Sequence, residues 1–260
     1  MIKYKTELFN KISANRELVL YLFIDTTLFV VGMVNFPIKP DRSCFFMKKL
    51  AEKAYGILDI VYFKKIGNNP RKQIITYFAD KPLRILDMCC GTGKNAMEIA
   101  SANTSGSIVG IDISTEALKK ADSKIHKRNL KNVTLLRMDA AHTTFQDKSF
   151  DGIIISLVLH ELKEKYNEKI IQEAKRLLKD NGTIIVLEWE LPTSLFRKIL
   201  FVPVAKSEPR GFEAFVTQNM KQYFLKHGLK TINLVHCDYS QVIFLKKNCV
   251  KTEDGYEQSK

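Results

Sequence analysis

The sequence lacks the cysteine and histidine patterns on which disulfide frameworks and metal-binding motifs depend. Its cysteines follow neither a paired framework nor a ligand spacing; they are Cys44, Cys89, Cys90, Cys237 and Cys249. The histidines are scattered and form no motif, so the sequence predicts no metal site. Reduced thiols are typical of the cytoplasm, and we therefore expect a cytoplasmic catalytic domain.

Other signals are missing as well. The chain has no P-loop lysine–serine pair, which argues against a nucleoside triphosphate as ligand. No small-residue cleavage site follows the apolar stretch near the start of the sequence, which argues against a removable signal peptide. Internal repeats and low-complexity runs are also absent, and 260 residues are enough for one domain with an extension.

Negative charge is scarce relative to positive charge. The chain has 41 lysines and arginines against 28 aspartates and glutamates, a formal net charge of +13. Such an excess suggests an acidic partner, which could be a nucleic acid or an anionic membrane surface. Many lysines nevertheless lie on predicted helix faces, which are usually solvated; Lys119, Lys120, Lys124 and Lys127 are examples.

The most informative segment that is present runs from residue 83 to residue 100. It reads as a short apolar strand that ends near Asp87, then a turn with Gly91 and Gly93, then a helix. The two glycines allow a sharp turn and a close approach of a ligand to the backbone. The helix start offers unpaired N–H groups and a positive dipole end to an anionic group. The segment therefore predicts a site for a nucleotide-like ligand.

The same turn is compatible with two kinds of cofactor. Residues 91–96 fit the dinucleotide fingerprint with a terminal alanine, and Asp112 follows at a suitable spacing. Asp87 argues against this interpretation, because its carboxylate would face a pyrophosphate at close range. S-adenosylmethionine carries a sulfonium, an ammonium and one carboxylate, so an acidic neighbour favours it.

Acidic residues end the next two predicted strands as well. Asp112 ends the second strand and is placed to accept hydrogen bonds from ribose hydroxyls, and Ser114 caps the following helix. Asp139 follows the third strand and could accept a hydrogen bond from the adenine amino group, while Ala140 leaves room for the ring. Each acid alone could be a solvated loop residue. Three acids at the ends of successive buried strands favour one common site.

Residues 86–93, which read Leu-Asp-Met-Cys-Cys-Gly-Thr-Gly, resemble the first motif of class I S-adenosylmethionine-dependent methyltransferases. The Cys-Cys-Gly-Thr-Gly spelling is most similar to enzymes that methylate quinone precursors in ubiquinone and menaquinone synthesis. The likeness extends to residues 150–153, 159–162 and 176–182, and covers about residues 46–248. It implies cofactor contacts from Asp87, Cys89, Gly91, Thr92, Gly93, Asp112, Ile113, Asp139, Ala140 and Leu157.

Alternation of apolar strands with helical stretches predicts an α/β fold with a mostly parallel sheet and helices on both faces. We expect strands near 83–88, 107–112, 133–138, 151–156, 182–188, 230–236 and 241–247. The resemblance implies a Rossmann-like seven-stranded sheet whose last two strands form an antiparallel hairpin. The methyltransferase domain is expected over residues 46–250, and the polar tail at 251–260 is expected to be disordered.

The first 45 residues lie outside the resemblance. Residues 18–36 are nearly continuous in apolar side chains and long enough to cross a hydrocarbon core, with basic residues on both sides. Asp25 would then lie near the bilayer centre at a cost of about 3 kcal/mol. One interpretation is a tether to the cytoplasmic face of the membrane. The other is a segment packed on the catalytic domain.

A long insert at residues 189–229 separates the fifth and sixth predicted strands. We expect a first helix at 194–204, limited by Pro203, and a second at 211–227. In this fold class such an insert commonly forms a lid over the acceptor, and its apolar and basic side chains suit a lipophilic acceptor or an anionic lipid surface. The alternative is an ordinary amphipathic helix packed on the sheet.

Methyl transfer is an in-line displacement in which positioning accounts for much of the acceleration. If the acceptor must lose a proton, His160, just beyond the fourth strand, is the candidate base. Glu161 and Glu188 are candidates for orienting the acceptor or His160. The alternative for His160 is a helix-start residue bonded to backbone.

The sequence thus favours a methyltransferase for a small lipophilic or aromatic acceptor, either a quinone precursor or a phospholipid. A nucleic-acid methyltransferase is the main alternative, but base-amino methylation usually needs an Asn/Asp-Pro-Pro-aromatic clamp. Residues 156–160 contain no proline and no aromatic side chain. An RNA substrate is therefore disfavoured. A nicotinamide-dependent oxidoreductase and a non-catalytic binding module are further alternatives.

Overall fold

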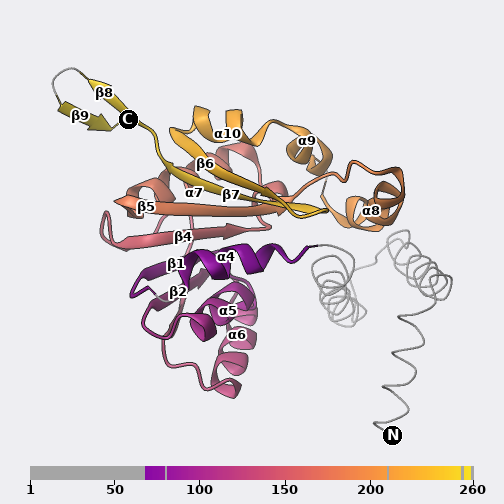
Figure 1. Ribbon diagram of the computed structural model, residues 1–260. Helices are drawn as coiled ribbons and strands as arrows, with labels where there is room; N and C mark the ends of the chain where they lie inside the picture. Colours follow the sequence, from indigo (N-terminus) through magenta and orange to yellow (C-terminus); the bar gives the residue numbers. More distant parts are fainter. Residues whose placement is uncertain (1–67, 80, 210, 253–254, 259–260) are drawn as a thin grey trace, which may run out of the picture.

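The computed structural model describes residues 68–258 except 80, 210, 253 and 254, and shows a central sheet with helices on both faces (Figure 1). The predicted extension at 1–45, with its apolar stretch at 18–36, lies outside the described residues. Among the helices that are described, none has the length and the apolar character needed to cross a bilayer.

Strands and helices alternate through the first half of the described chain. The elements are α4 (Pro70–Phe78), β1 (Arg84–Met88), α5 (Lys94–Ala102), β2 (Ser107–Asp112), α6 (Thr115–Lys127), β3 (Val133–Arg137) and β4 (Phe150–Ser156). A single 3₁₀ turn, η2 (Leu159–Glu161), then leads into α7 (Glu164–Leu177) and β5 (Leu178–Trp189). The insert contains α8 (Leu195–Ser207), α9 (Phe212–Thr217) and α10 (Met220–Lys226), and β6 (Leu229–His236) and β7 (Ser240–Lys247) complete the sheet.

The sheet confirms the predicted fold. Its strand order is β3-β2-β1-β4-β5-β7-β6, with parallel pairing from β3 through β5. β7 lies antiparallel between β5 and β6, as the predicted terminal hairpin requires. β1 stands at the centre with β2 and β4 on either side, so the strand order reverses there. In open α/β sheets, ligands bind outside the carboxyl ends of the strands at such a reversal.

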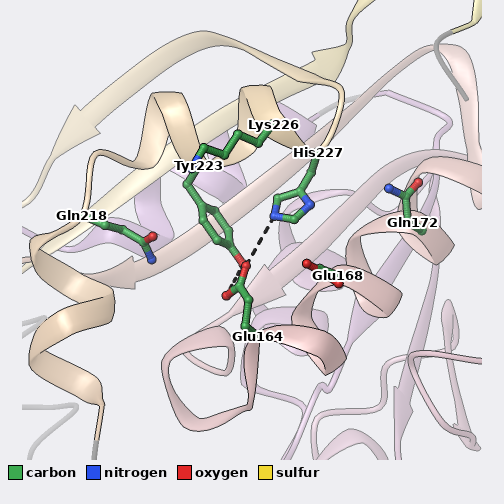
Figure 2. Close-up of a pocket in the computed structure, with 7 residues that line it drawn as sticks. All are labelled: Glu164, Glu168, Gln172, Gln218, Tyr223, Lys226 and His227. Carbon is green, nitrogen blue, oxygen red and sulfur yellow. Dashed lines mark hydrogen bonds and ion pairs between the residues drawn. The ribbon is translucent and has the colours of Figure 1, made fainter.

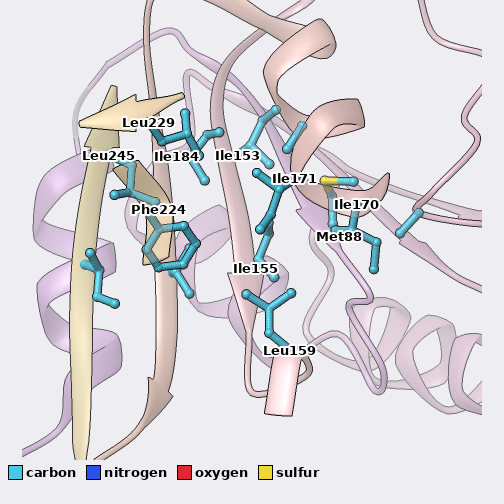
Figure 3. Close-up of a cluster of buried hydrophobic side chains, with 14 of the residues drawn as sticks. Met88, Ile153, Ile155, Leu159, Ile170, Ile171, Ile184, Phe224, Leu229 and Leu245 are labelled. Carbon is cyan, nitrogen blue, oxygen red and sulfur yellow. The ribbon is translucent and has the colours of Figure 1, made fainter. Parts of the chain in front are cut away.

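Two apolar layers hold the helices against the sheet. The first, shown in Figure 3, packs α7 and α10 on one face; it includes Met88, Ile153, Ile155, Leu159, Ile170, Ile171, Ile184, Phe224, Leu229 and Leu245. The second packs α4 and α5 on the other face and includes Ile74, Phe78, Ala96, Ile99 and Ile154. Because both faces of β1 and β4 are buried, these strands read as continuous apolar runs.

One close approach fixes α4 on the sheet. A side chain at Gly152 in β4 would place its Cβ 2.4 Å from the ring of Phe78. Phe78 itself is 1% exposed. The absence of a Cβ at residue 152 therefore allows the ring to lie directly on the strand, and α4 also contacts α5, where Arg71 Nε donates to Asn95 Oδ1 at 3.0 Å.

The insert differs from the prediction in two places. α8 continues to Ser207 although Pro203 was expected to limit it near residue 204. This part of α8 is at the surface, where Val202 is exposed, so a carbonyl that loses its helical partner can bind water. The helix expected over 211–227 is two helices, because the Asn219 side chain accepts from the Gln222 N–H and starts α10 anew.

The tail differs too. Where the sequence predicts a disordered segment from residue 251, the structure places β8 (Cys249–Thr252) and β9 (Gly255–Gln258) in a separate two-stranded antiparallel sheet. A polar composition alone does not exclude a hairpin, since strand pairing satisfies backbone groups whatever the side chains are.

Candidate active site

The carboxyl ends of β1, β2 and β4 bring three loops to the same edge of the sheet. The register aligns Met88 of β1 with Ile111 of β2 and Ile155 of β4. The residues that follow each strand, at 89–93, 113–114 and 157–161, therefore start from the same level. The cofactor residues predicted from sequence lie in these loops, in the loop after β3, or, for Asp87 and Asp112, at the carboxyl ends of β1 and β2.

The loop after β1 is built from left-handed backbone conformations. Cys89, Gly91 and Gly93 have φ values of 57°, 53° and 72°. A Cβ at Gly93 would lie 2.9 Å from the Ala121 side chain of α6, so this glycine permits close helix packing. A Cβ at Gly91 would meet nothing within 4 Å. Gly91 thus faces open space, where a ligand could approach the backbone.

Asp112 connects this loop to the end of β2. One carboxylate oxygen accepts from the Gly91 N–H at 2.7 Å, and the other accepts from the Ser114 N–H at 2.8 Å. Ser114 in turn accepts from the Ala117 N–H at 3.2 Å and caps α6, as predicted. Each carboxylate oxygen retains a second lone pair for a ribose hydroxyl. Next to it Ile113 is 64% exposed, an unusual position for an apolar side chain and one that suits contact with a flat ring.

Asp139 is held by a residue that the sequence did not reveal. Its carboxylate accepts from the Tyr166 hydroxyl of α7 at 2.5 Å and from the Ala141 N–H at 2.8 Å. Burial opposes ionisation, but these two hydrogen bonds outweigh it and lower the pKa of Asp139. The carboxylate therefore stays ionised at neutral pH and can accept a hydrogen bond. Ala140 beside it is buried.

Asp87 lies deeper than the sequence suggested. Its side chain is 0% exposed, and it accepts from the Ala96 N–H in the first turn of α5 at 3.2 Å. Burial raises the pKa of Asp87 to about 7, although the Ala96 hydrogen bond and the nearby Arg71 act in the opposite direction. Asp87 therefore stabilises the first turn of α5, directly after the loop, from a buried position. The direct contact with a sulfonium cofactor that we predicted needs an open path, which the buried side chain does not offer.

Four carboxylates act on the pKa of one residue in the loop after β1, Cys89. Burial raises the pKa of the Cys89 thiol to about 12, and the carboxylates of Asp112, Asp87, Asp139 and Glu161 all act in the same direction. Cys89 is therefore a neutral thiol, in agreement with a structural role in the loop. Its neighbours include the three strand-end acids and also Glu161 from the loop after β4.

His160 is the centre of a buried polar cluster beyond β4. Its Nδ1 lies 2.6 Å from Glu188 Oε2, and its Nε2 lies 3.3 Å from Glu208 Oε2. Burial would lower the pKa of His160, but Glu188 and Glu208 raise it to about 10. Both ring nitrogens thus face carboxylates, an arrangement that favours the protonated imidazole and does not support the predicted role as a base. Nor is the ring bonded to backbone, which was the alternative.

Glu188 and Glu161 lie on either side of this imidazole. Glu188 is the penultimate residue of β5, and its Oε1 accepts from the backbone N–H groups of Val158 and Leu159 at 3.2 Å and 2.9 Å. Glu161 is half exposed, with Oε1 3.9 Å from His160 Nε2. Leu157, the remaining predicted contact, has φ of 53° and is bonded through its N–H to the Leu187 carbonyl. Glu188 thus orients the His160 ring.

The insert contributes residues to the His160 cluster that the sequence did not reveal. Glu208 follows α8 and precedes a proline, and nothing in that pattern indicates a partner 48 positions earlier in the chain. Phe212 of α9 contacts the His160 ring edge-on, with ring centroids 5.4 Å apart. Phe201 of α8 packs between Trp189 and Tyr239, with ring centroids 5.7 Å and 6.0 Å away. The insert therefore places two aromatic side chains, Phe201 and Phe212, beside the His160 cluster; we call these two the aromatic wall.

A hollow of about 560 Å³ lies elsewhere, between α7 and α10 (Figure 2). Its lining is polar and consists of Glu164, Glu168, Gln172, Gln218, Tyr223, Lys226 and His227. Glu164 closes one side by contacts with Tyr223 at 3.3 Å and with His227 at 3.6 Å. None of the residues predicted to hold the cofactor lines this hollow, so it is not the site described above.

Comparison with known proteins agrees with this geometry. A family model described as a methyltransferase domain matches residues 79–244. The chain is 32% identical to a demethylmenaquinone methyltransferase of Lactobacillus johnsonii over 145 residues, which is 55% of this chain and 58% of that protein. It is 31% identical to the enzyme of the same name from Desulfitobacterium hafniense, over 54% of this chain and 56% of that protein. The matches thus span less than two thirds of these relatives.

Solved structures show the same fold. An S-adenosylmethionine-dependent methyltransferase from Aquifex aeolicus superposes with a TM-score of 0.56 at 18% identity, over 72% of this chain and 92% of that chain. A second one, from Methanosarcina mazei, gives a TM-score of 0.52 at 22% identity, over 67% and 96% of the two chains.

Proposed function

The chain belongs to the class I S-adenosylmethionine-dependent methyltransferases, and we propose that it methylates a small lipophilic aromatic acceptor of the quinone-precursor type. The cofactor is S-adenosylmethionine, which supplies an electrophilic methyl group on a positively charged sulfur. The family therefore leaves no support for the nicotinamide-dependent oxidoreductase considered from sequence.

The residues present fit this cofactor. Gly91 faces open space where any Cβ would intrude on a ligand, and the carboxylate of Asp112 is held beside it by two backbone N–H groups. We assign Asp112 to the ribose hydroxyls and Asp139 to the adenine amino group, with Ile113 against the ring. The other proposed contacts are Cys89, Thr92, Gly93, Ala140 and Leu157, while Asp87 acts from beneath by fixing α5.

The main support for the acceptor class is the aromatic wall beside the His160 cluster. Phe212 contacts His160 edge-on, and the Phe201 ring lies behind Phe212, tilted by 33° with ring centroids 6.2 Å apart; both belong to the insert and are 2% exposed. These rings make the region beside the cluster apolar, which suits an aromatic acceptor at its edge, and the half-exposed Glu161 is suited to a hydroxyl group of that acceptor. The names of the relatives, which share about 30% identity, point to the same class.

His160 acts in this proposal as a positioning residue. Its ring is fixed by Glu188 at one nitrogen and faces Glu208 with the other, so it holds two carboxylates in place. A ring protonated at neutral pH cannot take a proton from a phenolic acceptor. Glu161, half exposed and close to the Cys89 loop, is the carboxylate of the cluster that an acceptor can reach.

Methyl transfer to defined acceptors tests the proposal. The purified full chain is incubated with methyl-labelled S-adenosylmethionine and, in separate reactions, a reduced demethylated naphthoquinone, phosphatidylethanolamine vesicles or total RNA. We expect label in the quinol product, and none with an Asp112→Ala variant as control. Label confined to phospholipid or to RNA would replace the quinol with that acceptor, since phospholipid and RNA are the alternatives left by the sequence.

We also propose that α8 contacts an anionic membrane surface at its cytoplasmic side. Leu195, Phe196, Ile199 and Val202 lie on α8 and are between 42% and 76% exposed. Lys198, exposed on the same helix, adds positive charge. An apolar surface of this kind with basic neighbours is typical of helices that lie in the membrane interface. Such contact would bring the enzyme to an acceptor dissolved in the bilayer.

A further inference from the structure

Three potential metal ligands converge at the edge of the sheet, next to the Cys89 loop. His160 and Glu161 come from η2, and Glu208 comes from the end of α8. One ligand atom from each, the imidazole Nε2 and two carboxylate oxygens, lie within 4.8 Å of one another. Nε2 is 3.3 Å from Glu208 Oε2 and 3.9 Å from Glu161 Oε1. The three residues are not grouped in the sequence, and only the folded insert brings Glu208 to the other two.

Two of these atoms are buried without an aligned hydrogen bond. The side chains of His160 and Glu208 are 1% and 4% exposed. Although Nε2 and Oε2 are only 3.3 Å apart, neither atom has a partner that meets hydrogen-bond geometry. Buried polar atoms in native proteins nearly always have such a partner, and exceptions call for an explanation such as an ion.

The other ring nitrogen of His160 is arranged as in metal sites. Glu188 Oε2 binds Nδ1 at 2.6 Å, and Glu188 itself is held by the N–H groups of Val158 and Leu159. A carboxylate behind a histidine fixes the ring orientation, which leaves Nε2 directed at the ligand. Here Nε2 is directed toward Glu208 and Glu161.

Charge also favours a cation. The cluster places the carboxylates of Glu161, Glu188 and Glu208 around a single imidazole. An imidazole carries at most one positive charge and cannot balance three carboxylates, of which Glu188 and Glu208 are 0% and 4% exposed, and unbalanced buried charge is costly. A divalent ion in place of the Nε2 proton would reduce the net negative charge of the cluster by one unit and would give Nε2 and Glu208 Oε2 a common partner.

We propose that His160, Glu161 and Glu208 bind one divalent transition-metal ion, with Glu188 as the carboxylate that orients His160. Imidazole and carboxylate together suit Zn²⁺, Fe²⁺ or Mn²⁺. Metal–ligand bonds of about 2.1 Å in a tetrahedral site place neighbouring ligand atoms about 3.4 Å apart, close to the His160–Glu208 separation. Glu161, with its half-exposed side chain, must move toward the other two ligands, by about 0.5 Å relative to Nε2.

Three protein ligands leave a coordination position for another group. Catalytic metal sites keep such a position, whereas structural sites are closed by four protein ligands. If the proposed function is correct, a hydroxyl oxygen of the acceptor is the natural occupant, and the ion would stabilise its ionised form. The binding of the metal itself does not depend on that function.

Metal titration of the full chain tests the proposal. The protein is treated with chelator and dialysed. It is then titrated with Zn²⁺ by calorimetry and, in parallel, with Co²⁺ by visible absorption, which reports the coordination geometry. We expect one equivalent per chain. Glu208→Gln and Glu161→Gln should each weaken Zn²⁺ binding at least tenfold, and Glu188→Gln should weaken it by about ten- to a hundredfold.

A surface histidine provides the matched control. His126 lies 3.3 Å from Asp122 on exposed α6, and this pair could bind Zn²⁺ adventitiously. His126→Gln should leave the tight site intact. Folding of every variant is checked by circular dichroism and by binding of S-adenosylhomocysteine, which does not require these ligands.

The outcomes separate the metal site from the proposed function. The metal proposal would be overturned if the chain bound no stoichiometric Zn²⁺. It would also be overturned if binding were lost in His126→Gln but retained in Glu208→Gln. Stoichiometric binding that depends on Glu208, together with no methyl transfer to the quinol, would support the metal site and reject the acceptor class.

Discussion

The carboxylate of Asp112, at the end of β2, accepts a hydrogen bond of 2.7 Å from the backbone N–H of Gly91, in the turn after β1. This bond joins two loops that are 21 residues apart in the sequence. The acid expected to bind the ribose thus also fixes the position of the glycine beside which the ligand must pass. Binding and loop geometry depend on the same side chain.

We therefore expect Asp112→Asn to weaken cofactor binding strongly. The amide keeps one acceptor atom but loses the charge, and hydrogen bonds to a charged group contribute about 1.5–3 kcal/mol each. The dissociation constant of S-adenosylhomocysteine, measured by calorimetry, should rise more than tenfold. Asp122→Asn, on the exposed side of α6, is the control and should leave it unchanged. Equal affinity of the two variants would exclude Asp112 from the cofactor site.

The stability of the protein should depend on pH through Asp87. Its pKa of about 7 in the folded protein exceeds the ordinary value of 3.8, mainly because of burial. Between these values the folded state holds a proton that the unfolded state has lost, so stability falls as pH rises from about 4 to about 7. Arg71 and the Ala96 N–H reduce this effect, whereas Asp112 adds to it.

Asp87→Asn should remove this dependence, because the amide can still accept from Ala96 but does not ionise. In urea unfolding the variant should be more stable than the natural chain at pH 8, on the order of a few kcal/mol. The difference should be much smaller at pH 4. If the natural chain is less stable than the variant by the same amount at pH 4 and at pH 8, Asp87 does not titrate in this range.

The His160–Glu188 pair should show strong thermodynamic coupling. His160→Leu leaves Glu188 and Glu208 buried without their counter-charge, and removal of one partner of a buried pair typically costs about 3–5 kcal/mol. Glu188→Gln keeps the acceptor for the Val158 and Leu159 N–H groups. In the double variant the cost should be well below the sum of the two single costs. Additive costs in urea unfolding would mean that the two side chains do not interact.

Polar substitution on α8 should weaken membrane binding. In the full chain, Leu195→Ser, Phe196→Ser and Ile199→Ser are combined, and co-sedimentation with phosphatidylglycerol vesicles is measured. Burial of a large apolar side chain contributes about 1.5–3 kcal/mol, so the three changes should lower binding at least tenfold. The control combines Leu225→Ser and Ile232→Ser, which are exposed on α10 and β6. Equal loss in both variants would exclude a specific role of α8.

Much of the fold was predictable because its signals are local. Residues 83–88 and 107–112 are apolar runs long enough for buried strands, and each ends in an acid followed by a turn or a cap. The terminal hairpin was implied by the family resemblance, and the short connection between residues 236 and 241 agrees with it because it leaves no room for a crossover helix. These features depend on chain length and on period, both visible in the sequence.

The features of the site that the sequence did not reveal depend on distant contacts. Nothing near residue 208 indicates that its carboxylate faces His160, and nothing near residue 166 indicates a hydrogen bond to Asp139. The motif around Asp87 locates the acid but not its depth, at which the carboxylate accepts from the Ala96 N–H of α5 and lies near Arg71 of α4. Base chemistry at His160 was expected from its position after β4, and the carboxylates that oppose it come from β5 and the insert.

The position of β7 between β5 and β6 has a consequence for synthesis of the protein. The ribosome makes β5 before β7, which is the last of the seven strands, so one edge of β5 stays unpaired while roughly 50 residues are added, about 3–10 s at usual elongation rates. An apolar, unpaired strand edge invites association with other nascent chains. Chaperone demand should therefore be greatest in that interval, and should end when residues 240–247 leave the exit tunnel.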